Sequence, residues 1–165
     1  PYSGAHFDDL VLGIHRRLPT AAIGADTLIG FPGESETAFE NTYRRIEALP
    51  ITYLHVFPFS PRKGTPAYHF KERVPDPVVK ERCRRMRELG ERKKRAFYRS
   101  LIGRELSIIV EGVSTGSAGA VKGLSGNYVP VEVACQGPRP ERNQVVTARI
   151  DTVTEDLRVL GRQVQ

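Results

Sequence analysis

Residues 22–37, AIGADTLIGFPGESET, join a short apolar run to the start of a helical pattern. Residues 22–30 are nearly continuous in apolar side chains, which predicts a strand covered on both faces. Pro32 fixes its own φ angle and Gly33 permits a tight turn. Ser35 then offers an N-cap for the helix that follows. The stretch therefore predicts a strand, a turn and a helix, which is a unit of an α/β fold.

The elements on both sides of this stretch continue the alternation. Ser3 can cap a helix that ends before Pro19, and the apolar residues 53–59 predict a second buried strand. After a Pro-rich loop over residues 60–76, helical spacing returns at residues 77–99. The order helix, strand, helix, strand predicts parallel strands joined by right-handed crossovers.

The apolar period changes after residue 102, where short alternating segments are separated by turn residues, among them Ser114-Thr115-Gly116 and Ser125-Gly126-Asn127. Strands are predicted at residues 106–111, 118–122, 128–133, 145–151 and 157–160. Short strands at this spacing are typical of a small β-barrel or an OB-like module. We therefore expect an α/β domain over residues 1–99 and an all-β module over residues 100–165.

Positive charge is concentrated in the first of these domains. Residues 1–99 carry 18 Lys and Arg against 12 Asp and Glu, whereas residues 100–165 carry 7 of each. Such an excess favours a polyanion partner, nucleic acid above all. No apolar run approaches the ~20 residues needed to cross a bilayer. Two cysteines are too few for a disulfide scaffold in a chain of 165 residues, so we expect a cytoplasmic protein.

The loop at residues 30–34 lacks the pattern of a phosphate-binding loop. A P-loop needs a lysine after its second glycine, but Gly33 is followed by Glu34, whose carboxylate would repel a phosphate. The three glycines of a dinucleotide-binding loop are also missing. A tight turn explains these residues, yet ligands of α/β proteins bind at such strand ends. Both interpretations stay open.

The exit of the second strand is more specific. Residues 55–67, HVFPFSPRKGTPA, together with GFPGE at residues 30–34, resemble the radical S-adenosylmethionine methylthiotransferases. The same pattern includes IGAD at residues 23–26, the opening Pro1-Tyr2-Ser3, the long basic helix and the final β-module. The resemblance covers essentially the whole chain. It implies the carboxy-terminal part of a partial TIM-type radical SAM barrel, followed by an OB-like TRAM barrel.

Within that family, Arg62 after Ser60-Pro61 is similar to the branch that acts on tRNA. Residues 53–58 and 96–98 most resemble the enzymes that modify threonylcarbamoyladenosine, and the isopentenyladenosine branch is the near alternative. The resemblance implies transfer of a methylthio group to an adenosine beside the anticodon, with S-adenosylmethionine and [4Fe–4S] clusters as cofactors. A ribosomal-protein methylthiotransferase and a non-catalytic RNA-binding module also stay open at this point.

The cysteines depart from the family pattern. The family's CxxxCxxC motif and its amino-terminal cluster cysteines are missing, and Cys83 and Cys135 are expected to be ordinary residues. Because a cluster needs several converging thiolates, we expect this chain not to hold one. We expect the carboxy-terminal piece of a longer enzyme, inactive alone. An incomplete parallel sheet exposes an unpaired edge, so self-association is also expected.

The resemblance assigns candidate residues to two surfaces. The candidates for binding the cofactor are Asp26, Gly30, Phe31, Glu34, Val56 and Pro58. The candidates for binding the anticodon stem-loop of tRNA are Arg62, Lys63, Arg92, Lys94, Lys122, Asn127, Tyr128 and Arg142.

Each surface also has an ordinary structural explanation. Val56 can serve barrel packing, and Asp26, as a carboxylate in a buried strand, can bond to a neighbouring loop. Glu34 can bind a ribose or amino group, or favour the next helix through its dipole. His55 is expected to be a core histidine. Tyr128 can belong to the core, and the basic helix can be a solvated face.

Overall fold

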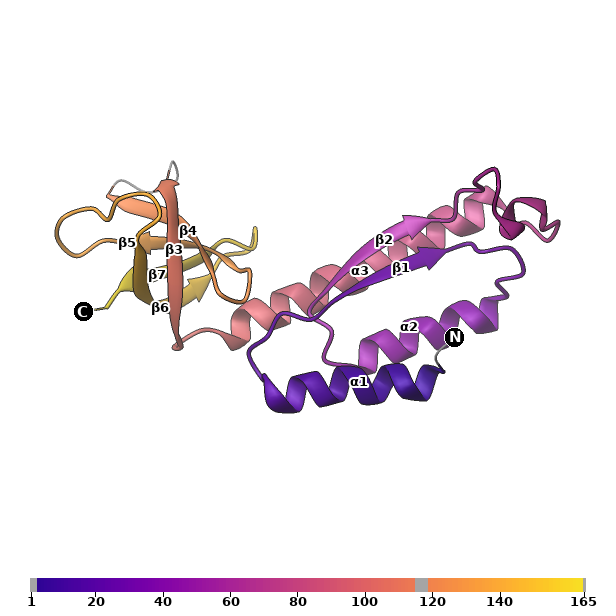
Figure 1. Cartoon of the computed structure of the whole chain (residues 1–165), viewed down its shortest axis with the longest axis horizontal. Coiled ribbons are helices and arrows are strands. Elements are labelled where there is room, and N and C mark those ends of the chain that lie inside the picture. Colours follow the sequence, from indigo (N-terminus) through magenta and orange to yellow (C-terminus); the bar gives the residue numbers. More distant parts are fainter. Residues whose placement is uncertain (1–2, 115–118, 165) are drawn as a thin grey trace. The chain divides into compact units, whose positions relative to one another are not determined.

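The computed structural model of the chain describes residues 3–114 and 119–164 and divides into two compact units, Pro1–Lys94 and Arg95–Gln165. The first unit contains helices α1 (Gly4–Arg17) and α2 (Glu36–Ala48) and strands β1 (Gly24–Ile29) and β2 (Tyr53–Pro58). It also contains the 3₁₀ turn η1 (Pro66–His69) and most of helix α3 (Asp76–Ser100). Figure 1 shows these elements in chain order. Among the described residues, no helix combines the length and apolarity needed to cross a bilayer.

Two serine caps fix the starts of the first helices. The Ser3 hydroxyl accepts a hydrogen bond from the His6 amide at 3.2 Å, and the Ser35 hydroxyl accepts one from the Ala38 amide at 3.1 Å. Each bond satisfies one of the amide donors that a helix leaves unpaired at its N-terminus. Both caps confirm the prediction from sequence.

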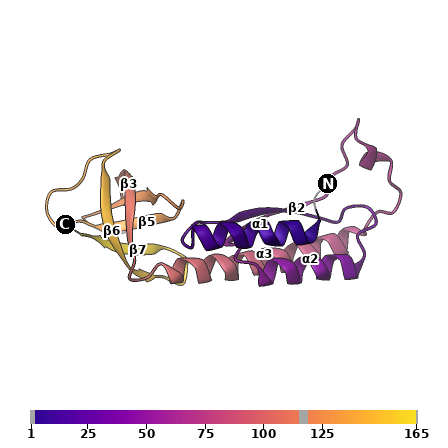
Figure 2. The same ribbon diagram turned by 60° about the horizontal axis from the view of Figure 1, so that its bottom comes forward.

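Strands β1 and β2 form a parallel pair in register, from Gly24 opposite Tyr53 to Ile29 opposite Pro58. The predicted parallel arrangement is therefore confirmed. The strand pair runs along one side of the helices (Figure 2). Apolar side chains on the helix-facing side of the strands pack with side chains of α1, α2 and α3 in a core. Its buried members are Val11, Ile23, Ile29, Phe39, Ile46, Leu49, Ile51, Cys83, Met86 and Leu89.

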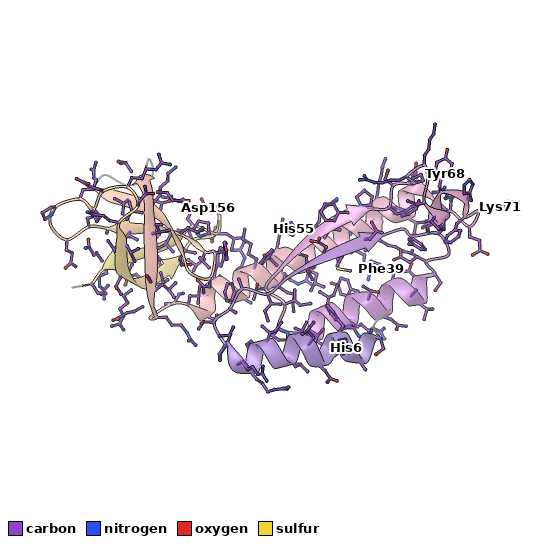
Figure 3. The ribbon with its side chains drawn as sticks, in the orientation of Figure 1. His6, Phe39, His55, Tyr68, Lys71 and Asp156 are labelled. Carbon is purple, nitrogen blue, oxygen red and sulfur yellow. The ribbon has the colours of Figure 1, made fainter. Side chains whose placement is uncertain are left out.

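The other face of the strand pair is open, so the prediction of strands covered on both faces is wrong. Burial alternates along β1, where Thr27 and Ile29 are buried and Asp26 and Leu28 are exposed. His55 is exposed on β2, whereas Phe39 is fully buried on α2 (Figure 3). The premise of a buried Asp26 and the prediction of a core His55 are therefore both wrong. The physical reason is that no element of the described residues packs on this face.

The second unit is a closed barrel of five strands in the order β3-β4-β5-β7-β6. The strands are β3 (Glu105–Val113), β4 (Ala120–Ser125), β5 (Pro130–Ala134), β6 (Val145–Val153) and β7 (Val159–Gln163). Among the strand pairs that the structure describes in this barrel, β5–β7 is parallel and the others are antiparallel. Alternate side chains of β3, β5 and β6 point inward, where Ile108, Val133 and Ala148, one from each strand, are fully buried. The small β-barrel expected from sequence is confirmed.

Two details of the barrel differ from the prediction or lie outside the described residues. The predicted strand at 128–133 begins later, at Pro130, because Tyr128 adopts a left-handed φ of 60° and belongs to the β4–β5 turn. Parts of two predicted elements lie outside the described residues: residues 115 and 116 of the turn at 114–116, and residue 118 of the strand at 118–122. In the first unit, Pro1 and Tyr2 also lie outside them.

Candidate site at the carboxyl ends of strands β1 and β2

The exits of the two parallel strands lie side by side. Ile29 pairs with Pro58, and the Phe59 amide donates to the Ile29 carbonyl at 2.7 Å. The loops that carry GFPGE and FPFSPRKGTPA therefore begin at adjacent points on the same edge of the sheet. This is the edge at which α/β proteins bind ligands.

Gly30 turns the chain out of β1. Its φ of +82° lies in the left-handed region, and a Cβ at this position would meet Val79 Cγ2 at 2.5 Å. The Gly30 amide donates to Glu34 Oε2 at 2.9 Å. The Glu34 amide in turn donates to the Phe31 carbonyl at 2.9 Å. The loop at residues 30–34 is thus closed by its own hydrogen bonds.

Arg82 of α3 anchors this loop from the helix side. Its side chain is 6% exposed, and Nη1 donates to both Glu34 Oε2 (2.9 Å) and the Glu34 carbonyl (3.0 Å). Nη2 donates to Glu36 Oε2 at 2.8 Å, and the guanidinium carbon lies 5.3 Å from the centroid of the Phe39 ring. Burial lowers the pKa of Arg82, but the hydrogen bonds to Glu36 and Glu34 outweigh burial and raise the pKa above its ordinary value.

Three aromatic rings gather at the strand exits. Phe31 packs edge-on against Phe59, with ring centroids 5.2 Å apart, and against Phe70, with centroids 6.0 Å apart. The Arg73 guanidinium lies 5.6 Å from the centroid of Phe59. Phe31 and Phe70 are 40% and 46% exposed, so the cluster offers apolar ring surface to solvent. Exposed apolar surface with cations beside it is suited to a planar, anionic partner.

The loop after β2 folds back over the exit of β1. The Gly33 amide donates to the Glu72 carbonyl at 2.8 Å, and Arg73 donates to the Tyr68 carbonyl at 3.0 Å. Figure 3 shows Tyr68 and Lys71 on this loop, beyond the strand ends. Arg62 and Lys63 are exposed on it, and within the described residues neither makes an ion pair. The site therefore combines aromatic rings with available positive charge.

Comparison with known proteins agrees with this geometry. The chain is 38% identical over 109 residues to the threonylcarbamoyladenosine tRNA methylthiotransferase MtaB of Aquifex aeolicus, covering 66% of this chain and 27% of that protein. It is 34% identical over 154 residues to the tRNA-2-methylthio-N(6)-dimethylallyladenosine synthases of Clavibacter michiganensis and Bifidobacterium adolescentis. Those matches cover 90% of this chain and 29% and 32% of the two relatives. No family model matches the chain.

The chain belongs to the radical S-adenosylmethionine methylthiotransferase family. It spans between 27% and 32% of the length of these three relatives.

The family implies iron–sulfur clusters, and the cysteines of this chain do not fit one. Cys83 is 2% exposed in the core of the first unit, and burial raises the pKa of its thiol, which disfavours the thiolate that ligates iron. Cys135 belongs to the other unit. Across residues 3–114 and 119–164, no three His, Cys, Asp or Glu side chains form a group able to hold a metal ion.

The family also implies S-adenosylmethionine, and part of the strand-exit site offers apolar surface of the kind on which an adenine ring packs. Phe31 and Pro58 are exposed at adjoining strand ends, as an apolar wall requires. The Gly30 amide donates to Glu34 Oε2 within the loop, and the same carboxylate oxygen pairs with Arg82. Val56 packs partly against the helix-side core. Asp26 lies on the open sheet face, within β1 and before the loop begins.

Many cations of α3 are already paired with carboxylates. Arg84 donates hydrogen bonds to Glu81 and Glu88. Arg85 donates to Glu40 and forms a longer ion pair with Glu36, at 3.5 Å. The candidate Arg92 donates to the Tyr43 hydroxyl at 2.8 Å and lies 3.7 Å from Glu47, with a side chain that is 56% exposed. Lys93 donates to the Glu47 and Leu49 carbonyls at the end of α2. The sequence showed the positive charge of this helix but not its partners on α2. Those partners lie more than 40 positions away in the chain from the arginines that they bind.

The candidate RNA-binding residues of the β-barrel lie on different elements. Lys122 is exposed on β4, and Arg142 is exposed in the turn before β6. Tyr128 is 78% exposed at the β4–β5 turn, so it is not a core residue. The Ser125 hydroxyl donates to Asn127 Oδ1 and accepts from the Val129 amide, and these bonds fix the turn beneath Tyr128. Lys94, the remaining candidate, is partly buried near the end of the first unit.

Proposed function

We propose that this chain is the carboxy-terminal part of a tRNA methylthiotransferase that adds a methylthio group to N6-threonylcarbamoyladenosine beside the anticodon. Residues 1–99 are its share of a radical SAM barrel, and residues 100–165 are its TRAM-like barrel. The observation that carries the proposal is the similarity to tRNA methylthiotransferases over as much as 90% of the chain. The adjacent exits of β1 and β2 support it, because a shared pocket mouth needs them at one edge.

A second branch of the family is the alternative substrate assignment. Relatives that cover 90% of the chain are dimethylallyladenosine-tRNA enzymes, whereas the MtaB relative covers 66% at a somewhat higher identity of 38%. The threonylcarbamoyl assignment rests on residues 53–58 and 96–98, which include His55 on the open sheet face. Both assignments share the same cofactor and the same class of RNA.

In this proposal the chain supplies binding and positioning. S-adenosylmethionine, when bound and reduced by an iron–sulfur cluster held elsewhere in the polypeptide, would supply the radical that takes hydrogen from a carbon of the tRNA adenine. Phe31 and Pro58 form one wall beside its adenine, and the fixed loop at residues 30–34 sets the position of Phe31. The cluster ligands belong to other parts of the longer polypeptide, since Cys83 and Cys135 do not fit that role. Arg62 and Lys63 contact RNA phosphates beside the strand exits.

Nucleoside mass spectrometry tests the substrate. Bulk tRNA is digested from a strain that lacks the gene containing this chain, and from the same strain with the gene restored. Loss of the 2-methylthio form of threonylcarbamoyladenosine, with its precursor accumulating, is the expected result. Loss of the 2-methylthio isopentenyladenosine instead would select the second branch. An unchanged set of methylthio nucleosides would overturn both assignments.

Replacing Arg62 and Lys63 together with glutamine is expected to weaken tRNA binding without destabilising the fold, because both side chains are exposed. Removing two phosphate contacts lowers the magnitude of the salt slope, log Kd against log salt, by roughly 1 to 2. Filter binding or fluorescence anisotropy at several salt concentrations measures this slope. The control is Arg84→Gln, since Arg84 is paired with Glu81 and Glu88. Equal slopes for all three proteins would contradict the assignment of this loop to RNA.

We also propose that the chain self-associates through the free edge of β1 when it is isolated. In the described residues β1 has β2 as its one strand neighbour, and a pocket of about 660 Å³ runs along it, lined by residues of α1, α2 and both strands. An unpaired strand edge beside apolar surface is a template for pairing with another chain. Leu28, which is 52% exposed on the open face, adds to this surface.

Leu28→Lys is expected to shift the isolated chain toward monomer, because a charge on an edge strand opposes pairing between copies. Sedimentation velocity over a hundredfold range of protein concentration measures the shift. Val145→Lys is the matched control, since Val145 is an exposed aliphatic residue of the barrel. A wild-type chain that stays monomeric at every concentration would contradict the proposed edge pairing.

A further inference from the structure

Arg82 is a buried cation on α3, the basic helix for which the sequence also allowed a solvated face. It is one of five buried polar or charged residues of the described chain, with 5% of its surface exposed. Burying a guanidinium is costly unless its donors are satisfied. Here Nε, Nη1 and Nη2 all donate to oxygens of Glu34 or Glu36. The hydrogen bonds of the guanidinium therefore all go to one short segment, residues 34–36, where the loop after β1 runs into α2.

The contact to Glu34 reaches the strand exit through a shared oxygen. Glu34 Oε2 accepts from Arg82 Nη1 at 2.9 Å and from the Gly30 amide at 2.9 Å. The second anchor, Glu36, lies in the first turn of α2. Arg82 thus ties the loop at residues 30–34 to the start of α2 at two points. A lysine in its place has no planar fork with which to hold both carboxylates at once.

The Phe39 ring limits the orientation of the guanidinium. Phe39 is fully buried, and its ring centroid lies 5.3 Å from the Arg82 guanidinium carbon. The guanidinium thus packs beside this ring while it donates to the two carboxylates. On the other side of the loop, Gly33 is held by the Glu72 carbonyl. The loop is therefore fixed from the α3 side by Arg82 and from the loop after β2 by residue 72.

We propose that Arg82 is a positioning residue, which acts through Glu34 to hold Gly30 and Phe31 in place for S-adenosylmethionine. This inference rests on the proposed function. Arg82 does not touch the cofactor; its effect passes through the Glu34 carboxylate to the Gly30 amide. The loop is consequently preorganised before any ligand arrives, which reduces the ordering cost of binding.

Hydrogen exchange tests the positioning directly, on this chain alone and without a cofactor. Arg82→Gln is expected to speed exchange of the Gly30 and Glu34 amides by roughly tenfold or more, because local opening no longer breaks the Arg82 bonds. Amides in the second unit, such as those of β3, are expected to exchange as before. Arg84→Gln, the same change at an exposed position of the same helix, is expected to leave the loop unchanged.

Cofactor binding tests the consequence, in the complete polypeptide that contains this chain. Arg82→Gln is expected to raise the Kd or KM for S-adenosylmethionine by roughly tenfold and to leave the Kd for tRNA unchanged. A purely structural defect would weaken both. Arg82→Lys, which keeps the charge but reaches one carboxylate, is expected to recover part of the loss. It also serves as the test if Arg82→Gln does not fold.

The outcomes separate the inference from the proposed function. If the wild-type polypeptide neither binds S-adenosylmethionine nor forms methylthio nucleosides, the proposed function fails, and with it the cofactor role of Arg82. If wild type binds the cofactor but Arg82→Gln and Arg82→Lys bind it equally well, the inference is overturned while the proposed function stands. Unchanged exchange at Gly30 in both variants would overturn the positioning itself.

Discussion

Phe39→Ala is expected to lower the free energy of unfolding of the first unit by about 3–5 kcal/mol, the range for removing a buried aromatic side chain. Phe39 is fully buried at the centre of the helix-side core. Its ring also faces two guanidinium groups, with carbons of Arg82 and Arg85 at 5.3 Å and 5.0 Å from the centroid. The substitution therefore leaves a cavity and removes the aromatic ring against which both guanidinium groups pack.

The measurement must report on one unit at a time, since two units need not unfold together. Denaturant-dependent hydrogen exchange of amides in α2 and β1 reports on the first unit, and that of β3 and β6 reports on the second. The destabilisation is expected in the first set alone. Phe70→Ala is the matched control, because Phe70 is 46% exposed and its loss leaves no buried cavity. A loss below about 1 kcal/mol at Phe39 would contradict the described core.

Gly123→Ala is expected to destabilise the barrel by about 1–3 kcal/mol or more, as overpacking does. Gly123 lies on β4, opposite Val110 and Val131. A Cβ built there would lie 2.3 Å from the Ile109 carbonyl oxygen and 2.6 Å from Ile108 Cγ2. Because the first of these atoms belongs to the backbone of β3, relief requires the strands themselves to shift.

The control for this variant is Gly126→Ala, in the turn that follows β4. A Cβ at Gly126 would have no atom within 4 Å, and its φ is not in the left-handed region. Barrel amides of β3 and β4 are expected to lose protection in Gly123→Ala and to keep it in Gly126→Ala. Equal protection in the two variants would show that the strands pass each other more loosely than described.

The sequence predicted the elements of this chain better than their burial. The Ser3 and Ser35 caps and the parallel strands follow from local patterns, and the structure confirms them. Burial of the open face was predicted wrongly because residues 22–30 contain too few polar side chains to reveal alternation. Whether Asp26 or His55 is covered depends on a packing partner, which local sequence does not encode.

The candidate site was likewise predictable in part: local sequence indicated where its loops begin but not the long-range contact that holds one of them. The predicted parallel arrangement placed both strand exits at one edge, because the carboxyl ends of parallel strands point to the same edge of a sheet. The contact between Arg82 and Glu34 joins residues 48 positions apart. No helical spacing reveals such a pair, and a glutamate after Gly33 gave no sign that a buried cation would satisfy it. An arginine flanked by core positions on the apolar side of a helix is the one signal that could have suggested it.

The backbone at residue 30 has a consequence for the evolution of the chain. Any L side chain there incurs the strain of a φ of +82° and also collides with Val79, so two independent penalties act on one position. Gly64 has a similar φ but open space around it, so asparagine is an acceptable replacement there. A saturation library selected for function should therefore retain glycine alone at position 30 while admitting substitutions at position 64.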